Sequence, residues 1–332
     1  MSSAALRAID WRQELTAAEM RLAGVVAVTP VRANRALNDE ARAHVFSKDE
    51  GVQTTGSFKL RGAWNALAAR KSHAGIRGVV TYSSGNFGRA LAYAASWCRL
   101  PVMVVTPDDT PKDKLAGMRA FGATIVMHDP TEDRVGIAQR ICAARDMVLI
   151  PPYDDPQVIA GQATTGTEFR HQVRELDALV VPVSGGGLLA GCALSAQSSP
   201  RRLRVFGVEP EARPKTRLSL RNGRRVEVPP LPTIADALRV TRPGAVTFPV
   251  IANLVEDVVT VNDAQIADAM TAAHRRFGPR YEPGGAAALA AVLSHLLPPE
   301  LQRIGVILTG SNISARRHQH STRAAAAPGA AR

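Results

Sequence analysis

Short runs of apolar and β-branched residues alternate with alanine-rich stretches of helical periodicity along most of the chain. Such runs favour strands, and apolar positions spaced three and four residues apart favour helices. The predicted strands are residues 78–82, 101–106, 124–128, 178–183, 204–209, 256–261 and 305–309. The predicted helices are residues 89–98, 112–121, 133–144, 188–196, 263–276 and 285–297. This alternation predicts an α/β protein with parallel sheets and helices on both faces.

The number of strand–helix units is too large for one comfortable sheet, and we expect two. The first would be built from about residues 75–150, and the second mainly from residue 153 onward. A ligand is expected between them, because ligands of such folds bind at the carboxyl ends of the strands. The segment 315–332 contains Ala, Arg, His and Pro without apolar periodicity, and we predict a disordered tail there.

Composition sets limits on the class of protein. The chain has 332 residues, of which 45% are hydrophobic and 21% charged, as is usual for a globular protein with a substantial core. No apolar stretch is long enough to span a bilayer, and the first 13 residues lack the order of a secretory signal. The three cysteines form no CxxC spacing, so neither a disulfide framework nor a zinc site is predicted. We expect a cytoplasmic protein without a membrane partner.

The net charge of +12 raises the question of a nucleic-acid partner. The basic residues are mostly scattered arginines, and no aromatic interleaving or nucleic-acid motif accompanies them. We therefore expect no nucleic acid among the partners. A basic surface also attracts anionic metabolites, which suits an enzyme that acts on small molecules.

Lys59 has the most informative sequence context. Residues 54–62 read Thr-Thr-Gly-Ser-Phe-Lys-Leu-Arg-Gly, and good helix formers continue to residue 70. Lys59 is thus predicted at a helix N-terminus, where the macrodipole disfavours its positive charge. A lysine that loses its proton there becomes an amine nucleophile of the kind that forms Schiff bases. A solvated lysine that opens a surface helix is the ordinary alternative, so the rest of the chain must decide.

Residues 181–191, Val-Pro-Val-Ser-Gly-Gly-Gly-Leu-Leu-Ala-Gly, carry the second signal. An apolar strand ends in Ser-Gly-Gly-Gly and leads directly into a helix. Glycines let successive backbone N–H groups converge, and the helix end adds partial positive charge, so this turn suits a phosphate. A plain glycine turn explains the same residues equally well.

Two further loops follow predicted strands. Residues 83–88, Ser-Ser-Gly-Asn-Phe-Gly, offer hydroxyls, an amide and free N–H groups that suit a carboxylate or a phenolic oxygen, although an ordinary N-capping turn is the simpler reading. Residues 308–312, Leu-Thr-Gly-Ser-Asn, place the hydroxyl of Thr309 at a strand end, where it can meet a ring nitrogen.

Taken in order, these motifs resemble the fold-type II pyridoxal-phosphate (PLP) enzymes, in particular the serine/threonine dehydratase and serine racemase family. The resemblance runs from about residue 29 to residue 312. Its landmarks are residues 56–62, 83–86, 160–162 (Ala-Gly-Gln), 184–188, 207–210 (Gly-Val-Glu-Pro), 282–283 (Glu-Pro) and 309–312. It implies two αβα sandwich domains of the tryptophan synthase β type with PLP in the cleft between them. Residues 1–74 and 153–314 would form the large PLP-binding domain and residues 75–152 a small mobile domain.

The resemblance also implies roles for individual residues. Lys59 would carry the cofactor and move the Cα proton, with Phe58 against the ring and Asn86 at its phenolic oxygen. Ser83, Ser84 and Asn86 would hold the substrate carboxylate. The phosphate would be wrapped by the backbone amides of Ser184, Gly185, Gly186, Gly187 and Leu188. Thr309 would meet the pyridine nitrogen, where relatives more often have serine.

The chemistry follows from the hydroxyl at position 309. A hydroxyl does not keep the pyridine protonated as an aspartate would, so the ring is a weaker electron sink and loss of a β-leaving group is favoured. The expected reaction is dehydration and deamination of a hydroxy amino acid such as L-threonine or L-serine to a 2-keto acid and ammonia. Ser84 leaves serine racemase activity as an alternative, because a hydroxyl facing Lys59 across the substrate can return a proton to the opposite face of Cα. Dehydratases of 3-hydroxyaspartate or of hydroxyectoine-derived substrates are further alternatives, and Arg242 is placed near the substrate side chain to favour a second carboxylate.

The chain departs from the family pattern at several positions. Phe87 replaces a common histidine, and Ala163 and Ala237 stand where relatives often have glycine. Some relatives bind a divalent cation through the carboxylate at Glu209 and a second acidic residue. Lys215 falls about where that second carboxylate belongs, so an ammonium can replace the ion and no metal is expected.

Two other classes of protein remain as alternatives. Residues 185–191, followed by a strand that ends at Glu209, imitate a nucleotide fingerprint and would indicate an NAD-dependent oxidoreductase. That interpretation leaves Lys59 and residues 83–86 unexplained. A non-catalytic binding protein of the same fold is disfavoured by the retained lysine. By analogy with such folds we expect a homodimer that acts on an amino acid.

Overall fold

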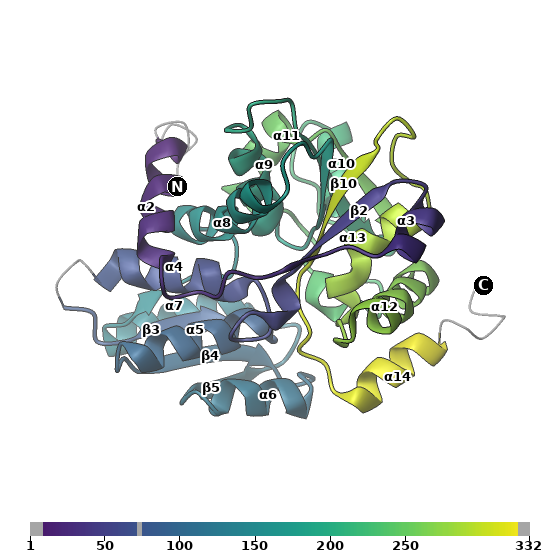
Figure 1. Cartoon of the computed structure of the whole chain (residues 1–332). Helices are drawn as coiled ribbons and strands as arrows, with labels where there is room; N and C mark the ends of the chain where they lie inside the picture. Colours follow the sequence, from purple (N-terminus) through teal and green to yellow (C-terminus); the bar gives the residue numbers. More distant parts are fainter. Residues whose placement is uncertain (1–8, 72–74, 325–332) are drawn as a thin grey trace.

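The computed structural model describes residues 9–71 and 75–324, and its strands form two separate sheets (Figure 1). The larger sheet has the order β1-β2-β10-β7-β8-β9 and the smaller the order β5-β4-β3-β6. The strands of the larger sheet are β1 (Val31–Arg32), β2 (His44–Asp49), β10 (Arg303–Leu308), β7 (Ala178–Pro182), β8 (Arg204–Pro210) and β9 (Asp257–Val261). Those of the smaller sheet are β5 (Thr124–His128), β4 (Val102–Pro107), β3 (Val79–Tyr82) and β6 (Val148–Leu149).

All strand pairs in the two sheets are parallel except β1 with β2 at one edge. The central strands read as continuous apolar runs, as expected when helices cover both faces. The predicted α/β class with two parallel sheets is thus confirmed. The smaller sheet draws its strands from within residues 75–152, while the domain limits themselves stay a prediction.

Helices cover both faces of the six-stranded sheet. On one face, α8 (Pro156–Gln172), α9 (Gly187–Ala196) and α11 (Thr247–Leu254) bury an apolar cluster around Phe169 and Leu189. On the other face, α3 (Arg35–Ala41), α12 (Asp263–Phe277) and α13 (Pro283–Leu293) bury a second cluster around Tyr281 and Leu289. These two layers fix the carboxyl ends of β7, β8 and β10 side by side.

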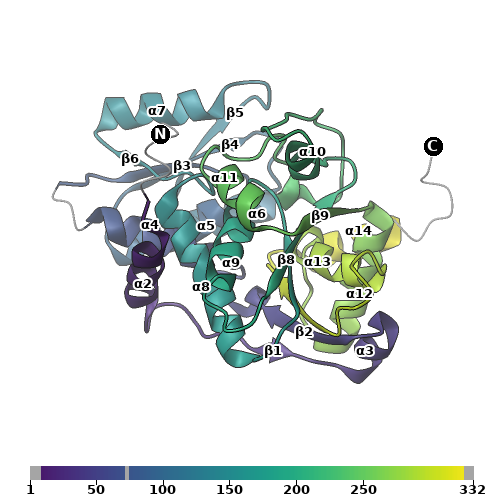
Figure 2. The same cartoon turned by 90° about the horizontal axis from the view of Figure 1, so that it is seen from above.

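The four-stranded sheet is also covered on both faces (Figure 2). On one side, α7 (Arg134–Arg145) packs Ala138 on β3 and β4. On the other lie α5 (Asn86–Trp97), α6 (Lys112–Arg119) and α4 (Lys59–Lys71), which share a cluster around Leu60 and Leu91. Because α4 also packs on α8, it connects the two halves of the molecule.

A buried ion network fixes α4 against the six-stranded sheet. The guanidinium of Arg61 lies 2.7 Å from Glu50 and 3.0 Å from Glu168, and the ammonium of Lys48 also bonds Glu168. Glu50 belongs to the short helix η1 (Glu50–Val52), and Lys48 to β2. Arg61 and Glu50 are almost fully buried, so the four charges depend on one another for compensation.

The predicted tail is partly wrong. Residues Ala315–Ala324 form helix α14, and only residues 325–332 lie outside the described part. Polar contacts rather than an apolar stripe hold this helix: Arg317 lies 2.9 Å from Asp236, and the buried His318 packs edge-on against His274 of α12. A search for apolar periodicity does not detect such contacts.

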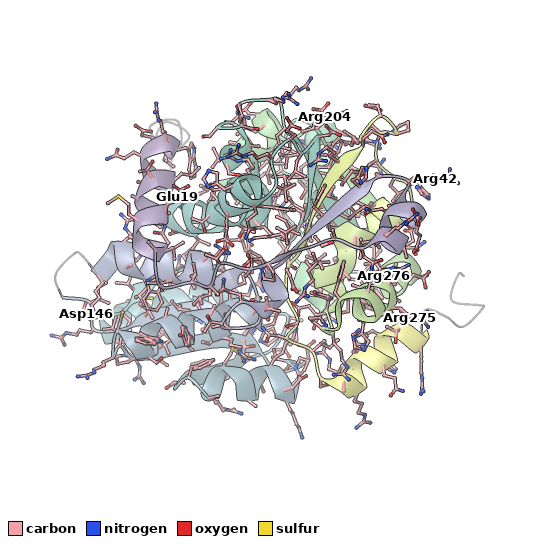
Figure 3. The ribbon with its side chains drawn as sticks, in the orientation of Figure 1. Glu19, Arg42, Asp146, Arg204, Arg275 and Arg276 are labelled. Atoms are coloured by element: carbon pink, nitrogen blue, oxygen red, sulfur yellow. The ribbon has the colours of Figure 1, made fainter. Side chains whose placement is uncertain are left out.

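The positive charge is spread over the molecule. Arg204 lies at the top of the view, Arg42 at its right edge, and the neighbouring Arg275 and Arg276 lie lower on the right (Figure 3). Several arginines are neutralised, for example Arg204 by Glu300 at 2.6 Å. Within residues 9–71 and 75–324, no helix is both long enough and apolar enough to cross a membrane.

Candidate active site

A cleft between the two sheets collects the residues that the sequence singled out. Its lining includes the end of β3 and the loop after it on one side, and the ends of β7 and β10 on the other. All the predicted site residues line it: Phe58, Lys59, Ser83, Ser84, Asn86, Ser184, Gly185, Gly186, Gly187, Leu188 and Thr309. The structure thus brings together motifs that lie as far apart in the sequence as Phe58 and Thr309.

Lys59 is the first residue of α4, and its half-buried side chain extends along the cleft. The preceding backbone is anchored to β10, because the N–H of Phe58 donates to the carbonyl of Thr309 at 3.1 Å. The amine donates to the carbonyl of Pro152 at 3.4 Å and forms no ion pair within the described residues. Desolvation lowers the pKa of Lys59 to about 8, against a smaller raising effect of Glu282. A much larger fraction of this amine than of an ordinary lysine is therefore neutral and nucleophilic near physiological pH, although the charged form still predominates.

The glycine loop joins β7 to α9 in a conformation that needs glycine. Gly186 precedes the helix with φ 100°, which is in the left-handed region. A Cβ on Gly185 would lie 2.2 Å from the ring of Tyr153. The hydroxyl of Thr247 donates to the carbonyl of Gly185 at 2.7 Å and braces the loop. The bare backbone and the helix N-terminus line the cleft and have the chemistry that suits an anion.

In the loop after β3, one serine stabilises the backbone and the next faces the cleft. The hydroxyl oxygen of Ser83 accepts hydrogen bonds from the N–H groups of Gly85 at 3.2 Å and Gly88 at 3.1 Å. Ser83 therefore satisfies an N–H group in the first turn of α5, although Gly85 occupies the N-cap position. Ser84, in contrast, is exposed on the cleft wall, where its hydroxyl is accessible to a ligand.

Glu282 is a cleft residue to which the sequence assigned no role. Its side chain is 2% exposed, and one carboxyl oxygen accepts a hydrogen bond from the side-chain amide of Asn86. The other oxygen has no hydrogen-bond partner among the described residues. Burial raises the pKa of Glu282, because the charged form is desolvated. An unsatisfied buried carboxyl oxygen in a ligand cleft points to a missing partner.

Besides Lys59, two basic side chains of the described residues line the cleft, and neither is the predicted Arg242. Arg242 is exposed and lies outside the lining, because the chain that contributes Val240 to the cleft then turns to the surface. The ammonium of Lys114 is neutralised by Asp236 at 2.7 Å. Arg134, the first residue of α7, lies with its guanidinium carbon 5.4 Å from the ring centre of Tyr82. It forms no ion pair within residues 9–71 and 75–324, so its charge is available to a ligand.

Comparison with known families identifies the cofactor for which this cleft is built. A model of the family described as "Pyridoxal-phosphate dependent enzyme" matches residues 22–310. The chain belongs to this family. The resemblance inferred from the motifs is confirmed, and the cofactor of this PLP enzyme is pyridoxal 5′-phosphate.

Individual relatives agree with this assignment. The chain is 40% identical to the L-threo-3-hydroxyaspartate ammonia-lyase of a Pseudomonas species, over 93% of this chain and 97% of the relative. It is 36% identical to the serine racemase of Schizosaccharomyces pombe, over 92% and 95%. The structure of maize serine racemase superposes with a TM-score of 0.89 at 34% identity, covering 94% of this chain and 96% of that one. The PLP enzyme is thus a fold-type II member of the ammonia-lyase and racemase group.

The cleft of this PLP enzyme fits its cofactor. The glycine loop leaves room for an anion where a Cβ would intrude, and Lys59 offers an amine whose pKa is lowered to about 8. Glu282 supplies an unpaired polar atom beside them. The dinucleotide interpretation fails for a physical reason: Glu209 is fully buried and paired with Lys215 at 2.8 Å, so it cannot reach a ribose.

Proposed function

We propose that this enzyme converts a 3-hydroxy amino acid to a 2-keto acid and ammonia, and that it prefers substrates with a second carboxylate, such as 3-hydroxyaspartate. L-Threonine and L-serine lack this second carboxylate. One observation carries it: Arg134 lines the cleft beside Ser84 without an ionic partner in the described chain. A guanidinium matches a carboxylate in charge and in geometry. The relative named for 3-hydroxyaspartate supports the same choice.

The protein residues divide the work as follows. The backbone amides of Ser184, Gly185, Gly186, Gly187 and Leu188 hold the cofactor phosphate, and Phe58 packs against the ring. Asn86 donates to the phenolic oxygen, and Thr309 meets the ring nitrogen. Ser83, Ser84 and Asn86 bind the α-carboxylate of the substrate. This division agrees with the position of all these residues on the cleft lining.

Lys59 is the proposed acid–base residue. Bound pyridoxal phosphate withdraws electrons from an attached amino acid and makes its Cα–H acidic. The amine of Lys59 removes that proton, the Cα–Cβ bond gains double-bond character, and the β-hydroxyl leaves with a proton as water. Once free of the cofactor, the enamine product takes up a proton at Cβ and becomes an imine. One water molecule hydrolyses its C=N bond, so the overall products are the keto acid and ammonia. No oxidant or reductant is consumed.

A racemase activity at the same site is the second candidate, and Ser84 is the observation that favours it. Its exposed hydroxyl and the amine of Lys59 both reach the cleft. Two proton-transfer groups on one ligand allow removal of the Cα proton by one and return by the other. A hydroxyl at this position therefore supports exchange of enantiomers alongside elimination.

A substrate panel with one pair of variants tests the proposal. The wild type, Arg134→Met and Arg140→Met would be assayed with L-threo-3-hydroxyaspartate, L-serine, D-serine and L-threonine, with keto acid and enantiomer both measured. Arg140 is an exposed arginine on the same helix and serves as the matched control. Arg134→Met is expected to lower kcat/KM for 3-hydroxyaspartate by about tenfold to a hundredfold, with little change for L-serine. Equal losses on both substrates, or a wild type that prefers L-threonine, would contradict it.

We further propose a cytoplasmic homodimer. Three free cysteines within the described chain support a reducing compartment. Sedimentation of the purified enzyme measures the oligomer, and a monomer at micromolar concentration would refute that part.

A further inference from the structure

Lys215 forms a buried contact that the catalytic scheme does not use. It is the first residue of α10 (Lys215–Arg221), and its side chain is fully buried. Its Nζ atom donates to Glu209 at 2.8 Å and to the carbonyl oxygen of Val183 at 3.1 Å. These partners stand at the carboxyl ends of the neighbouring strands β7 and β8. A buried ammonium is tolerated only when it is paired and hydrogen-bonded, and both conditions are met here.

The carboxylate of Glu209 is equally well satisfied. Beyond the ammonium, it accepts hydrogen bonds from the N–H of Thr216 at 2.9 and 3.0 Å and from that of Arg217 at 3.0 Å. Each carboxylate oxygen therefore has partners in the first turn of α10. This arrangement leaves Lys215 free to use a second donor on Val183.

Val183 is the residue from which the glycine loop departs. Its N–H donates to the carbonyl of Val208 at 2.8 Å, and its own carbonyl accepts from Lys215. Its backbone is thus held on both sides, one residue before Ser184. At the other side of the loop, the carbonyl of Gly185 accepts from Thr247. The direction in which the loop amides face is therefore set at two points, and Lys215 supplies the first.

We propose that Lys215 is a positioning residue for the phosphate-binding loop. Its ammonium fixes the carbonyl of Val183, so that the following amides converge on the cofactor phosphate. The effect should be specific for the phosphate group, because Lys215 does not line the cleft and touches neither Lys59 nor the ring-binding residues. This inference rests on the phosphate role proposed above for residues 184–188.

Two forms of the cofactor separate this role from a general effect on folding. The apoenzyme would be titrated with pyridoxal phosphate and with pyridoxal, which lacks the phosphate but carries the same aldehyde. Lys215→Met is expected to raise the Kd for pyridoxal phosphate about tenfold or more, while the Kd for pyridoxal stays within about threefold of the wild type. Lys112→Met, at the exposed first residue of α6, is the matched control and should change neither. An unchanged Kd for pyridoxal phosphate, or a parallel loss of both ligands, would overturn the proposal.

The double variant Glu209→Gln/Lys215→Met avoids the unpaired buried carboxylate that the single variant would leave and that destabilises a fold. It removes both charges and the contact to Val183, and it should show the same phosphate-specific loss. The phosphorus-31 resonance of the bound cofactor should shift in both variants, and an unchanged resonance would count against the role of Lys215. The wild type tests the underlying assignment: if it binds pyridoxal as tightly as pyridoxal phosphate, the loop is no phosphate site. If it prefers the phosphate and the double variant keeps that preference in full, only the role of Lys215 fails.

Discussion

The carboxyl group of Glu282 accepts a hydrogen bond from the side-chain amide of Asn86, which comes from the opposite side of the cleft. The carbonyl oxygen of the same amide accepts from Asn312 at 2.8 Å, and Asn312 in turn accepts from Arg89 at 3.1 Å. This chain of contacts determines which end of the amide is NH₂. Asn86 therefore presents a donor toward the cleft, as a phenolic oxygen requires.

Glu282 should also tune the protonation of Lys59. The neutral amine captures pyridoxal phosphate, so the capture rate of the apoenzyme should rise with pH around the pKa of about 8. Ionised Glu282 favours the charged amine, and Glu282→Gln should therefore move the midpoint of the rate profile to lower pH. Visible absorbance and borohydride trapping measure the capture. A midpoint that stays in place or rises would show that Glu282 carries no charge at that pH, and Glu211→Gln at an exposed position is the control.

A second prediction concerns the backbone conformation of the glycine loop. Alanine at Gly186 would adopt φ 100°, and its Cβ would lie 2.7 Å from Ile251 and 2.8 Å from Thr247. Gly223 also has a positive φ, 63°, but open space around it. Both substitutions to alanine should cost about 1–2 kcal/mol of unfolding free energy from backbone strain. Only Gly186→Ala should also weaken binding of pyridoxal phosphate, by about tenfold or more, and equal affinities in the two variants would refute phosphate binding by this loop.

Ser84 makes a third prediction, on the balance of two reactions. Ser84→Ala should lower the rate of D-serine formation from L-serine by about a hundredfold or more, because one proton-transfer group is lost. Keto acid formation should fall much less, since Lys59 remains. Chiral chromatography and a keto acid assay of one reaction mixture give both rates. Ser96→Ala, at the exposed end of α5, the helix that follows the Ser84 loop, is the control, and a Ser84→Ala enzyme that still racemises would remove Ser84 from the mechanism.

Lys215 leads to a fourth prediction, that the enzyme needs no divalent cation. Its ammonium already occupies the place beside Glu209 and the carbonyl of Val183. Removal of metals with EDTA should therefore leave Tm and kcat/KM unchanged. A ligand that binds only the native state raises Tm, so added Mg²⁺ should cause no such rise. A fall in Tm after EDTA treatment that Mg²⁺ reverses would contradict this expectation.

The periodic parts of the chain could be predicted well. The strand at 124–128 has the predicted bounds, and the other predicted strands and helices lie within a few residues of those observed. The missed elements carry weak local signals. β2 ends in Lys48 and Asp49, and α8 contains two glycines and several threonines, so only the partners that bury them reveal their state.

The site residues differ in the same way, because some carry a local sequence signal and others do not. Backbone motifs, such as residues 184–187, are recognisable in sequence because glycine is required locally. Arg134 and Glu282 have no such local signature. Arg134 opens an ordinary helix, and Glu282 becomes informative only when its carboxyl is seen buried beside Asn86. The placement of Arg242 was wrong for this reason, since its nearness in sequence to cleft residues did not fix its direction.

The position of β10 has a consequence for how the protein is made. This strand is translated last among the ten, yet it pairs with β2 and with β7 in the interior of its sheet. On the ribosome, the edges of β2 and β7 that pair with β10 stay without this partner until residue 308 has emerged from the exit tunnel. Residues 79–149 already contain all four strands of the other sheet, so this half can mature first. The nascent enzyme should therefore depend on chaperones most during synthesis of its second half.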